Sequence, residues 1–514
     1  MLSRTTLRST SPGPARAPVA RLAWKAAALA AAALAAVLTA SVPALASPAA
    51  PGSLAAQAPA PGVTQVSSDP FAADSAPAAA HATEVEPDTF AWGSTVVTAF
   101  QTGRVFDGGA SDVGWATSQN GGVSWTHGFL PATTTASSPA GPFFAASDAS
   151  VAYDARDGVW LTSWLGLHEK GGGTVDVMLS RSTDGGLSWS APVTIAATGT
   201  FYDKNWTVCD NNSASPHYGN CYTEFDNASA RDLELMSTSS DGGQTWGPPT
   251  PTADNVHGLG GQPVVQPSGR VVVPFEALGG QIRAFSSDDG GQTWGASVLV
   301  SSISAHRVAG LRTSPLPTAE INRDGTVYVA WQDSRFEGGT ANDIVLSTSP
   351  DGSSWSPVSR IPIDPVGSNL DHFIPGLAVN RTSAGSHTQL ALTYYFDTNP
   401  ACTGSTCQIQ AGFTSSGDNG ATWSKPVTVS QPMQLGWLAP TNQGVMVGDY
   451  ISTSFLAGQQ RVIGVFAAGF APAADGSLNE PMFAALEPLR AGTNRTTTSP
   501  AVSTGAPNLP GTAF

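Results

Sequence analysis

Ionisable side chains stand where several short apolar runs of the sequence begin. They form the pairs Asp203-Lys204, Asp371-His372 and Asp449-Tyr450, and other runs place Asp148, His257 and Arg312 at the same step. Carboxylates, imidazoles and basic groups that face one another push their pKa values apart, which is the usual setting of acid–base catalysis. A guanidinium can also hold a carboxylate through two parallel hydrogen bonds. If these run starts meet in the fold, they predict a site for an acidic ligand.

Structural roles compete with this interpretation for several residues. Asp203 and Asp449 can cap their own loops, and a single histidine such as His257 is commonly a hydrogen-bonded loop residue. Arg312 and the Asp371-His372 pair do not recur, which favours an individual role for them. The residues expected to bind substrate are Arg312, Asp203, Lys204, His257 and Asp449, and those expected to take part in catalysis include Asp371 and His372.

A short repeated phrase sets the spacing of the apolar runs. It reads Ser-x-Asp-x-Gly-x-Ser/Thr-Trp, and six copies or close variants end at Trp125, Trp189, Trp246, Trp294, Trp355 and Trp423. Asp-Gly or Asn-Gly between alternating runs predicts a tight turn, because the side chain accepts local backbone N–H groups and glycine supplies positive φ. The aspartates expected to be structural are Asp184, Asp241, Asp289, Asp351 and Asp418.

The intervals between the repeats predict the fold. Each holds short alternating runs, as at 317–321, 326–331 and 344–348, and no convincing amphipathic helix appears. A four-stranded propeller blade needs roughly 40–50 residues, which each interval can hold with generous loops. Three more runs follow the sixth copy. We therefore expect an all-β propeller of four-stranded antiparallel blades, seven in number and closed by an N-terminal strand near Phe90, with six blades as the alternative.

The order of strands within a blade predicts where the chemistry lies. In a four-stranded meander the repeated turns lie at one end of the blade, and the first strand begins at the other end. The second strand also ends there, which adds Arg104, Glu276 and Arg335 to the residues of that face. Arg104 and Arg335 occupy equivalent positions in two blades. This recurrence favours a structural ion pair of the same kind in each blade as an alternative to substrate binding.

The repeated phrase resembles the Asp box, or BNR repeat, of sialidases and related secreted β-propeller proteins. The resemblance implies that these turns are structural and remote from the active site. In sialidases three arginines hold the sugar carboxylate, a tyrosine paired with a glutamate is the nucleophile, and an aspartate is the acid/base. By position it implies Tyr450, Glu276 and Asp112 for the catalytic roles and Arg312, Arg104 and Arg335 for the trio. The Phe/Tyr-Arg-Ile-Pro phrase of the family's first arginine is absent.

Three functions fit these observations. The resemblance favours a glycoside hydrolase of the exo-α-sialidase type that cleaves terminal acidic sugars from glycans. A polysaccharide lyase with Tyr450 or His372 as base is the second. The third is a non-catalytic propeller that binds glycan or protein, because a fold alone does not decide function. Asp112 also has a structural interpretation, because Asp176 and Asp343 likewise stand six residues before a repeat serine.

Composition indicates an exported protein. Residues 1–46 combine basic residues, an alanine-rich apolar stretch and a small-x-small cleavage site, which is typical of a signal peptide; a membrane anchor is the alternative. We expect a linker at 47–84, the propeller at 85–488 and a loose tail at 489–514. Removing 1–46 takes five of the 23 basic and none of the 38 acidic residues, which leaves a net charge of −20. That charge argues against nucleic acid as a partner, and we expect a secreted monomer that binds carbohydrate.

The four cysteines form two close pairs, Cys209 with Cys221 and Cys402 with Cys407. In an exported protein such pairs predict two local disulfides that hold loops. Zinc ligation is the competing interpretation, although the spacing differs from that of zinc knuckles. We expect no cofactor and no metal site; the segment Asp210-Asn-Asn-Ser is only a weak calcium candidate.

Overall fold

The computed structural model describes residues 62–71, 79–170, 172–403 and 406–498. The expected signal peptide, residues 47–61 of the expected linker and residues 499–514 of the expected tail lie outside the described residues. Within the described ranges, no helix is both long enough and apolar enough to span a bilayer.

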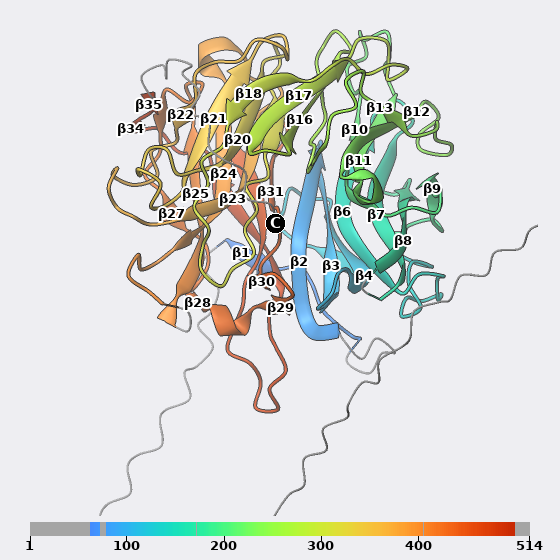
Figure 1. Cartoon of the computed structure of the whole chain (residues 1–514), viewed down its shortest axis with the longest axis horizontal. Coiled ribbons are helices and arrows are strands. Elements are labelled where there is room, and N and C mark those ends of the chain that lie inside the picture. Colours follow the sequence, from blue (N-terminus) through green and yellow to red (C-terminus); the bar gives the residue numbers. More distant parts are fainter. Residues whose placement is uncertain (1–61, 72–78, 171, 404–405, 499–514) are drawn as a thin grey trace, which may run out of the picture. The chain divides into compact units, whose positions relative to one another are not determined.

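Antiparallel β-sheets make up the described chain, as the alternating runs predicted (Figure 1). Most strands pair with their neighbours in sequence, so the chain forms successive groups of four or five strands. The first two groups join into one eight-stranded sheet through the pair Ala110↔Ala146. The first three groups are β2 (Ala79–Trp92), β3 (Thr95–Val105), β4 (Ala110–Ser118) and β5 (Thr126–Phe129); β6 (Ala145–Asp154), β7 (Val159–Glu169), β8 (Gly172–Ser182) and β9 (Val193–Ala196); and β10 (Tyr202–Cys209), β11 (Cys221–Asn227), β12 (Leu233–Ser239) and β13 (Thr250–Pro251).

The later groups follow the same order. They are β14 (Gly258–Leu259), β15 (Val264–Val265), β16 (Val271–Ala277), β17 (Gln281–Ser287) and β18 (Val298–Ser302); β19 (Thr318–Ile321), β20 (Val327–Asp333), β21 (Asp343–Ser349) and β22 (Ser359–Arg360); β23 (His372–Val379), β24 (Leu390–Asp397), β25 (Gln408–Ser416), β27 (Val427–Thr428) and β28 (Met433–Gln434); and β31 (Ser452–Phe455), β32 (Arg461–Ala467) and β33 (Met482–Pro488) with β1 (Val63–Gln65). Closure of these groups into a seven-bladed ring stays a prediction.

Short elements complete the described chain. β26 (Thr422–Trp423) pairs with β34 (Asn494–Arg495), β29 (Ala439–Thr441) pairs with β30 (Gly444–Met446), and β35 (Thr497–Thr498) extends the sheet of β22. Three single-turn 3-10 helices cover Ala228–Ala230, Gly385–His387 and Leu435–Trp437.

The N-terminal strand that joins the last group is β1, so the expectation of a strand near Phe90 in that role was wrong. β1 pairs with β33 in the register Val63↔Ala485, while Phe90 lies in β2, the first strand of the first complete group. β1 and the start of β2 fall inside the range expected to be a disordered linker, and β34 and β35 fall inside the expected tail. The composition of these segments did not indicate strands, because strands pair through backbone N–H and C=O groups and almost every residue type carries both.

The repeated turns share one set of hydrogen bonds. In the second copy the Ser182 hydroxyl donates to Asp184 Oδ1 at 2.8 Å, and the same oxygen accepts the backbone N–H of Ser188 at 3.0 Å. Gly186 has φ 80° and lies so close to Thr117 of the preceding group that a Cβ would approach Thr117 Oγ1 to 2.5 Å. Equivalent serine–aspartate bonds recur at Asp241, Asp289, Asp351 and Asp418. Carboxylate and glycine therefore fix each turn locally.

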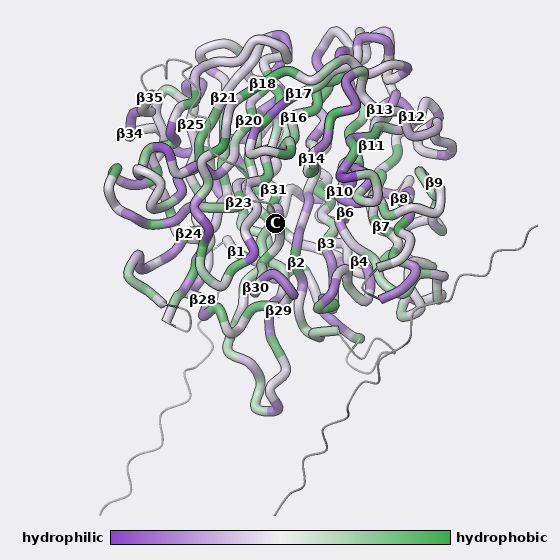
Figure 2. The backbone as a smooth tube through the Cα atoms, in the orientation of Figure 1, coloured by the Kyte–Doolittle hydropathy of each residue, from purple (hydrophilic) through white to green (hydrophobic). Residues whose placement is uncertain are grey.

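Large side chains of neighbouring groups pack against one another. The repeat residue Trp294 lies edge-on to Tyr222 of the preceding group, with ring centroids 6.2 Å apart. Trp164, Trp331 and Trp423 are fully buried. Figure 2 shows hydrophobic residues along many of the strands and a hydrophilic stretch in β2. The two expected disulfides, Cys209–Cys221 and Cys402–Cys407, are confirmed.

Several first strands carry a bulge with one residue in the left-handed region. The register shifts between Val85 and Asp88 in β2, between Ser147 and Ser150 in β6, and between Asp203 and Trp206 in β10. The left-handed residues at these bulges are Glu86 (φ 56°), Asp148 (φ 49°) and Lys204 (φ 50°), and Ile374 (φ 50°) is their counterpart in β23. A bulge re-aims a side chain, and non-glycine residues hold such φ values only where the surroundings impose them.

Candidate functional site

A polar pocket of ≈ 270 Å³ lies where several first strands begin. Its charged lining comprises Glu86, Arg104, Asp107, Asp148, Asp203 and Arg312. Four of the residues come from β2, β3, β6 and β10, while Arg312 comes from the segment before β19. The bulges explain the gathering, because each turns an ionisable side chain out of the regular alternation of its strand.

Two basic groups and Asp449 form a buried ion network beside the pocket. The Arg312 guanidinium forms a bidentate pair with the Asp449 carboxylate, in which Nε donates to Oδ1 at 2.8 Å and Nη2 donates to Oδ2. Lys204 Nζ lies 3.3 Å from Asp148 Oδ1 and 3.7 Å from Asp449 Oδ2. Burial opposes ionisation of Asp449, but Arg312 and Lys204 outweigh it and hold the pKa of this carboxyl below its usual range. Asp449 therefore ionises more readily than an ordinary aspartate.

Two other carboxyl groups of the pocket favour the protonated state. Burial, reinforced by the charge of Asp148, raises the pKa of Asp203 to about 7. The same two causes raise the pKa of Glu86 to about 7. Glu86 Oε1 accepts the backbone N–H of Asp449 at 3.1 Å, and Gln101 donates to the other oxygen. Asp203 is less buried than Glu86, and the one hydrogen bond that the structure gives its carboxylate comes from the Lys204 backbone N–H at 3.0 Å.

Arg104 lines the same pocket but has different partners. Its Nη1 donates to the carbonyls of Val105 at 2.8 Å and of Gly109, and its Nε contacts Met446 Sδ at 3.2 Å. Burial lowers the pKa of this guanidinium, which still ionises far above neutral pH. Arg104 thus adds positive charge to the pocket, with backbone carbonyls as its nearest acceptors.

Tyr450 lies in the network and is not among the residues that line the pocket. The hydroxyl donates to the Ala149 carbonyl at 3.2 Å, and Lys204 Nζ lies 4.3 Å from the ring centroid. Trp206 packs edge-on against the ring at 5.1 Å between centroids. Burial raises the pKa of Tyr450 well above its usual value. A buried phenol engaged with a carbonyl is poorly placed to act as a nucleophile or a base.

Three residues assigned by resemblance lie outside this pocket. Glu276 lies in β16, where burial raises the pKa of its carboxyl to about 7. Asp112 is buried in β4 and accepts hydrogen bonds from Thr133 Oγ1 and from the Val113 backbone. Arg335 forms a fork with Asp333, through Nε at 2.8 Å and Nη2 at 2.7 Å. Arg335 therefore has an acidic partner two residues away, whereas Arg104 contacts backbone carbonyls, so the ion pair expected at both positions is found only at Arg335 among the described residues.

Three further residues from the first-strand starts also lie elsewhere. His257 Nδ1 contacts the Arg231 carbonyl at 2.8 Å on the surface. Asp371 accepts from the Asn342 backbone at 2.8 Å and lies 3.0 Å from His306 Nδ1. His372 is buried, which lowers its pKa, and its Nδ1 lies 3.3 Å from the Asn342 carbonyl. The structure thus brings together Arg312, Arg104, Asp203, Lys204, Asp449 and Tyr450 from the sequence-based set, and separates the rest.

Glu86 is a member of the pocket that sequence reasoning missed. It precedes Pro87 in a run without the repeated phrase, and its role depends on the bulge in β2. Asp148 stood at a predicted strand start but was not assigned a role. Glu86 and Asp148 share one feature that could have identified them: in each of the first three groups, the first strand has an ionisable residue at its bulge.

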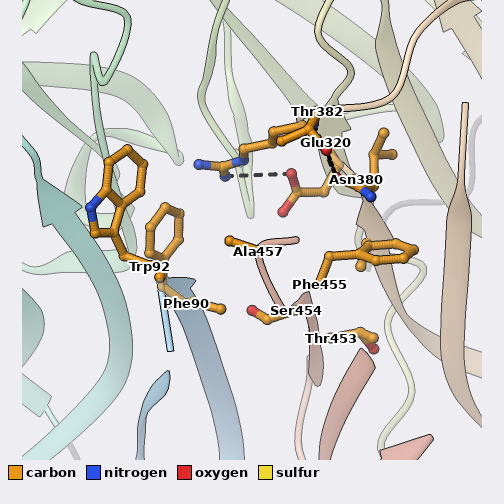
Figure 3. Close-up of a pocket in the computed structure, with 14 residues that line it drawn as sticks. Phe90, Trp92, Glu320, Asn380, Thr382, Thr453, Ser454, Phe455 and Ala457 are labelled. Carbon is orange, nitrogen blue, oxygen red and sulfur yellow. Dashed lines mark hydrogen bonds and ion pairs between the residues drawn. The ribbon is translucent and has the colours of Figure 1, made fainter. Parts of the chain in front are cut away.

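A second pocket, of ≈ 370 Å³, is lined by residues near the opposite ends of β2, β23 and β31. Figure 3 shows Phe90, Trp92 and Phe455 on its walls, with the Glu320 carboxylate between them. Arg381 lies over the Phe90 ring, 4.5 Å from the centroid, and its Nη2 lies 3.5 Å from Glu320 Oε2. This pocket offers aromatic surface and a single ion pair, whereas the first pocket offers several carboxyl and basic groups.

Comparison with known proteins found similar solved structures. A protein of unknown function from Dyadobacter fermentans is 17% identical, with a TM-score of 0.43, and the alignment covers 69% of this chain and 99% of that one. A Trypanosoma rangeli sialidase in complex with sialic acid is 12% identical, with a TM-score of 0.43, and the alignment covers 66% and 58%. An ulvan lyase of polysaccharide lyase family 25 is 11% identical, with a TM-score of 0.46, and the alignment covers 79% and 94%.

No protein-family model matches the chain, and no curated protein matches it. The alignment with the sialidase spans little more than half of that chain's length. The residues of the pocket itself carry the proposal that follows.

Proposed function

We propose that this chain is a secreted glycoside hydrolase that cleaves terminal acidic sugars from glycans, in the manner of an exo-α-sialidase. One observation carries the proposal: a single pocket joins Asp203, whose pKa is raised to about 7, to the ion network of Asp148, Lys204, Asp449 and Arg312. Groups whose pKa values are pushed apart in one site are the hallmark of paired acid and base roles.

Four residues that line the pocket, and Tyr450 beside it, have roles in this proposal. Arg312 and Arg104 hold the carboxylate of the sugar, for which their positive charge is suited. Asp203 donates its proton to the glycosidic oxygen as the bond from that oxygen to the anomeric carbon breaks. Asp148 supplies negative charge at the developing oxocarbenium ion, and either attacks the anomeric carbon or activates the water that does. Tyr450 positions Lys204 through its ring and does not react.

The same pocket supports the other two hypotheses less well. A lyase needs a base that removes a proton next to a carboxylate, but Tyr450 donates to the Ala149 carbonyl and His372 is not among the pocket-lining residues. Binding without catalysis is the second candidate, because Arg312 is already paired with Asp449. The aromatic pocket around Phe90 and Trp92 adds to that candidate, because aromatic walls with a few polar groups are typical of ligand sites.

The proposal includes the wider architecture. The successive strand groups close into a seven-bladed propeller. The pairing of β1 with β33 supports this, because it places the first described strand in the sheet of the last group. The two disulfides support export to an oxidising compartment. We propose that the mature protein acts as a monomer.

Hydrolysis of a substrate panel tests the proposal. The purified protein is assayed against sialosides, glycosiduronic acids and neutral glycosides, with an Asp203→Asn variant in parallel. Turnover confined to an acidic glycoside and lost in the variant supports the proposal. Cleavage that yields an unsaturated sugar identifies a lyase, and turnover of neutral glycosides alone contradicts the role of the arginines. Absence of turnover with binding of an acidic sugar favours the non-catalytic candidate.

A further inference from the structure

Two carboxylates and one imidazole meet away from the proposed catalytic pocket. Asp343 begins β21, His372 begins β23, and Asp364 lies in the segment between β22 and β23. One ligand atom of each residue lies within 4.8 Å of the other two. The three residues therefore bring together two neighbouring strand groups and the segment that connects them.

In each of the two carboxylates, one oxygen contacts Arg360 and the other has no hydrogen-bond donor among the described residues. Arg360 Nη2 lies 2.7 Å from Asp343 Oδ1 and 2.5 Å from Asp364 Oδ1. Their Oδ2 atoms are buried and have no hydrogen-bond partner within the described part of the chain. Asp343 is 1% exposed, so bulk water cannot donate a hydrogen bond to its Oδ2 atom. A buried carboxylate oxygen without a donor is unfavourable unless another group satisfies it.

The orientation of His372 adds an independent observation. Its Nδ1 lies 3.3 Å from the Asn342 carbonyl, an arrangement in which Nδ1 carries the proton. Nε2 then carries a lone pair and lies 3.9 Å from Asp364 Oδ2, which is too far for a hydrogen bond. A lone pair that faces a carboxylate is repulsive unless a cation lies between them. Metal-binding histidines commonly donate their other ring N–H to a backbone carbonyl in this way.

The charges of the neighbouring side chains also favour binding of a cation. Three acidic side chains, those of Asp343, Asp364 and Glu337, surround the single guanidinium of Arg360 within 3.9 Å. Arg360 is 1% exposed. One positive charge does not balance three carboxylates in a buried setting, whereas an added divalent ion does.

We propose that Asp343, Asp364 and His372 bind one divalent transition-metal ion, with zinc as the best match. Carboxylate and imidazole ligands suit zinc and manganese, while calcium prefers oxygen ligands alone. Three protein ligands leave a position for water, and Asp364, 15% exposed at its side chain, lies at the solvent side of the site. The ion would join β21 to β23 and stabilise the contact between their groups. This inference does not depend on the proposed function.

Metal uptake by the full chain with its disulfides intact tests the inference. The protein is stripped with a chelator, exchanged into zinc, manganese or calcium solutions, dialysed and assayed for bound metal, and its Tm is measured in parallel. We expect about one equivalent of zinc, a higher Tm with zinc, and weaker manganese binding. Asp364→Asn and His372→Gln should each lower zinc affinity at least tenfold, because loss of only an outer-shell partner of a ligand already costs about 10–100-fold. His306→Gln, which alters a nearby histidine that contacts Asp371, is the matched control.

The outcomes separate the metal site from a plain ion cluster. Zinc binding that is lost in the two ligand variants and retained in His306→Gln supports the site. No zinc uptake by the folded protein, as judged by circular dichroism, overturns it. Uptake that neither ligand variant weakens also overturns it, because the zinc then lies elsewhere. If His372→Gln fails to fold, the Asp364→Asn result decides, since the amide retains the oxygen that accepts from Arg360.

Discussion

Lys204 Nζ lies 3.3 Å from Asp148 Oδ1, and both residues occupy the left-handed position of a bulge in their strands. Their strands are neighbours, because the Thr207 backbone in β10 donates to Ser150 Oγ in β6 at 3.1 Å. The equivalent bulges in β6 and β10 thus bring two oppositely charged side chains together beside the polar pocket. Strain of this kind is found at sites where a fixed side-chain position is needed.

We expect Asp203 to set the alkaline limb of the pH–activity profile. If Asp203 must be protonated to donate to the leaving oxygen, the active fraction falls as pH rises through its pKa of about 7. At pH 8 the protonated fraction would be roughly a tenth, so kcat/KM should drop about tenfold from its value at lower pH. Asp203→Asn should lower kcat by about 10²–10⁴-fold on substrates with poor leaving groups. A flat profile up to pH 9 would remove Asp203 from the acid role.

We expect Arg312 to contribute to both activity and stability. From sequence alone, Arg312→Ala is expected to abolish turnover with little change in Tm. The fork with buried Asp449 alters the second half of that expectation, because the variant leaves a buried carboxylate with Lys204 as its remaining close basic partner. We now expect loss of turnover together with destabilisation of about 2–5 kcal/mol, measured by denaturant unfolding. Arg312→Ala with full activity and unchanged stability would exclude both roles.

Tyr450 can lose its hydroxyl at little cost to catalysis. Tyr450→Phe keeps the ring beneath Lys204 and removes only the hydrogen bond to the Ala149 carbonyl. We expect kcat to stay within about threefold of the parent and stability to fall by about 1 kcal/mol. Steady-state kinetics on the best acidic substrate provide the measurement. A loss of several hundredfold would instead identify the tyrosine as the nucleophile that the sialidase resemblance implied.

Asp112 makes stability depend on pH. Burial raises its folded-state pKa to about 7, while the unfolded chain ionises it near pH 3.9. Between these values the unfolded state binds fewer protons, so this group's contribution to stability is complete below about pH 3.9 and is lost as pH rises to about 7, by at most about 1.4 kcal/mol per unit.

Denaturant unfolding from pH 5 to 8 checks this contribution. The free energy of unfolding of the parent should fall toward pH 7 more steeply than that of Asp112→Asn, whose amide does not ionise. Activity of the variant should persist, because Asp112 contacts Thr133 rather than the pocket. Parallel pH curves for the two proteins would show that Asp112 is ionised in the folded state.

Pattern and topology predicted much of the fold and part of the site. The serine–aspartate turns follow from residue types at fixed spacing, and Arg312, Asp449, Asp203 and Lys204 were placed together because a meander brings strand starts to one end. Arg104 was found because the end of a second strand reaches the same face.

Identifiable physical reasons explain why other residues lie outside the pocket or were not predicted. Glu86 depends on a bulge, a backbone irregularity with no residue signature of its own. Glu276 and Arg335 were assigned by position relative to a family pattern, and position in a strand does not specify which neighbour a side chain reaches. The direction of the Tyr450 hydroxyl depends on Ala149, about 300 residues away in sequence, with which it forms a hydrogen bond.

Binding of a free acidic sugar tests the central claim most directly. Calorimetric titration of N-acetylneuraminic acid and of glucuronic acid into the Asp203→Asn variant measures recognition without turnover, and Asp203→Asn combined with Arg312→Lys serves as the comparison. We expect saturable binding of at least one of these acids, weakened at least tenfold in the double variant, and no binding of the neutral sugar galactose. Equal affinity in both variants, or tighter binding of galactose than of either acid, would contradict it.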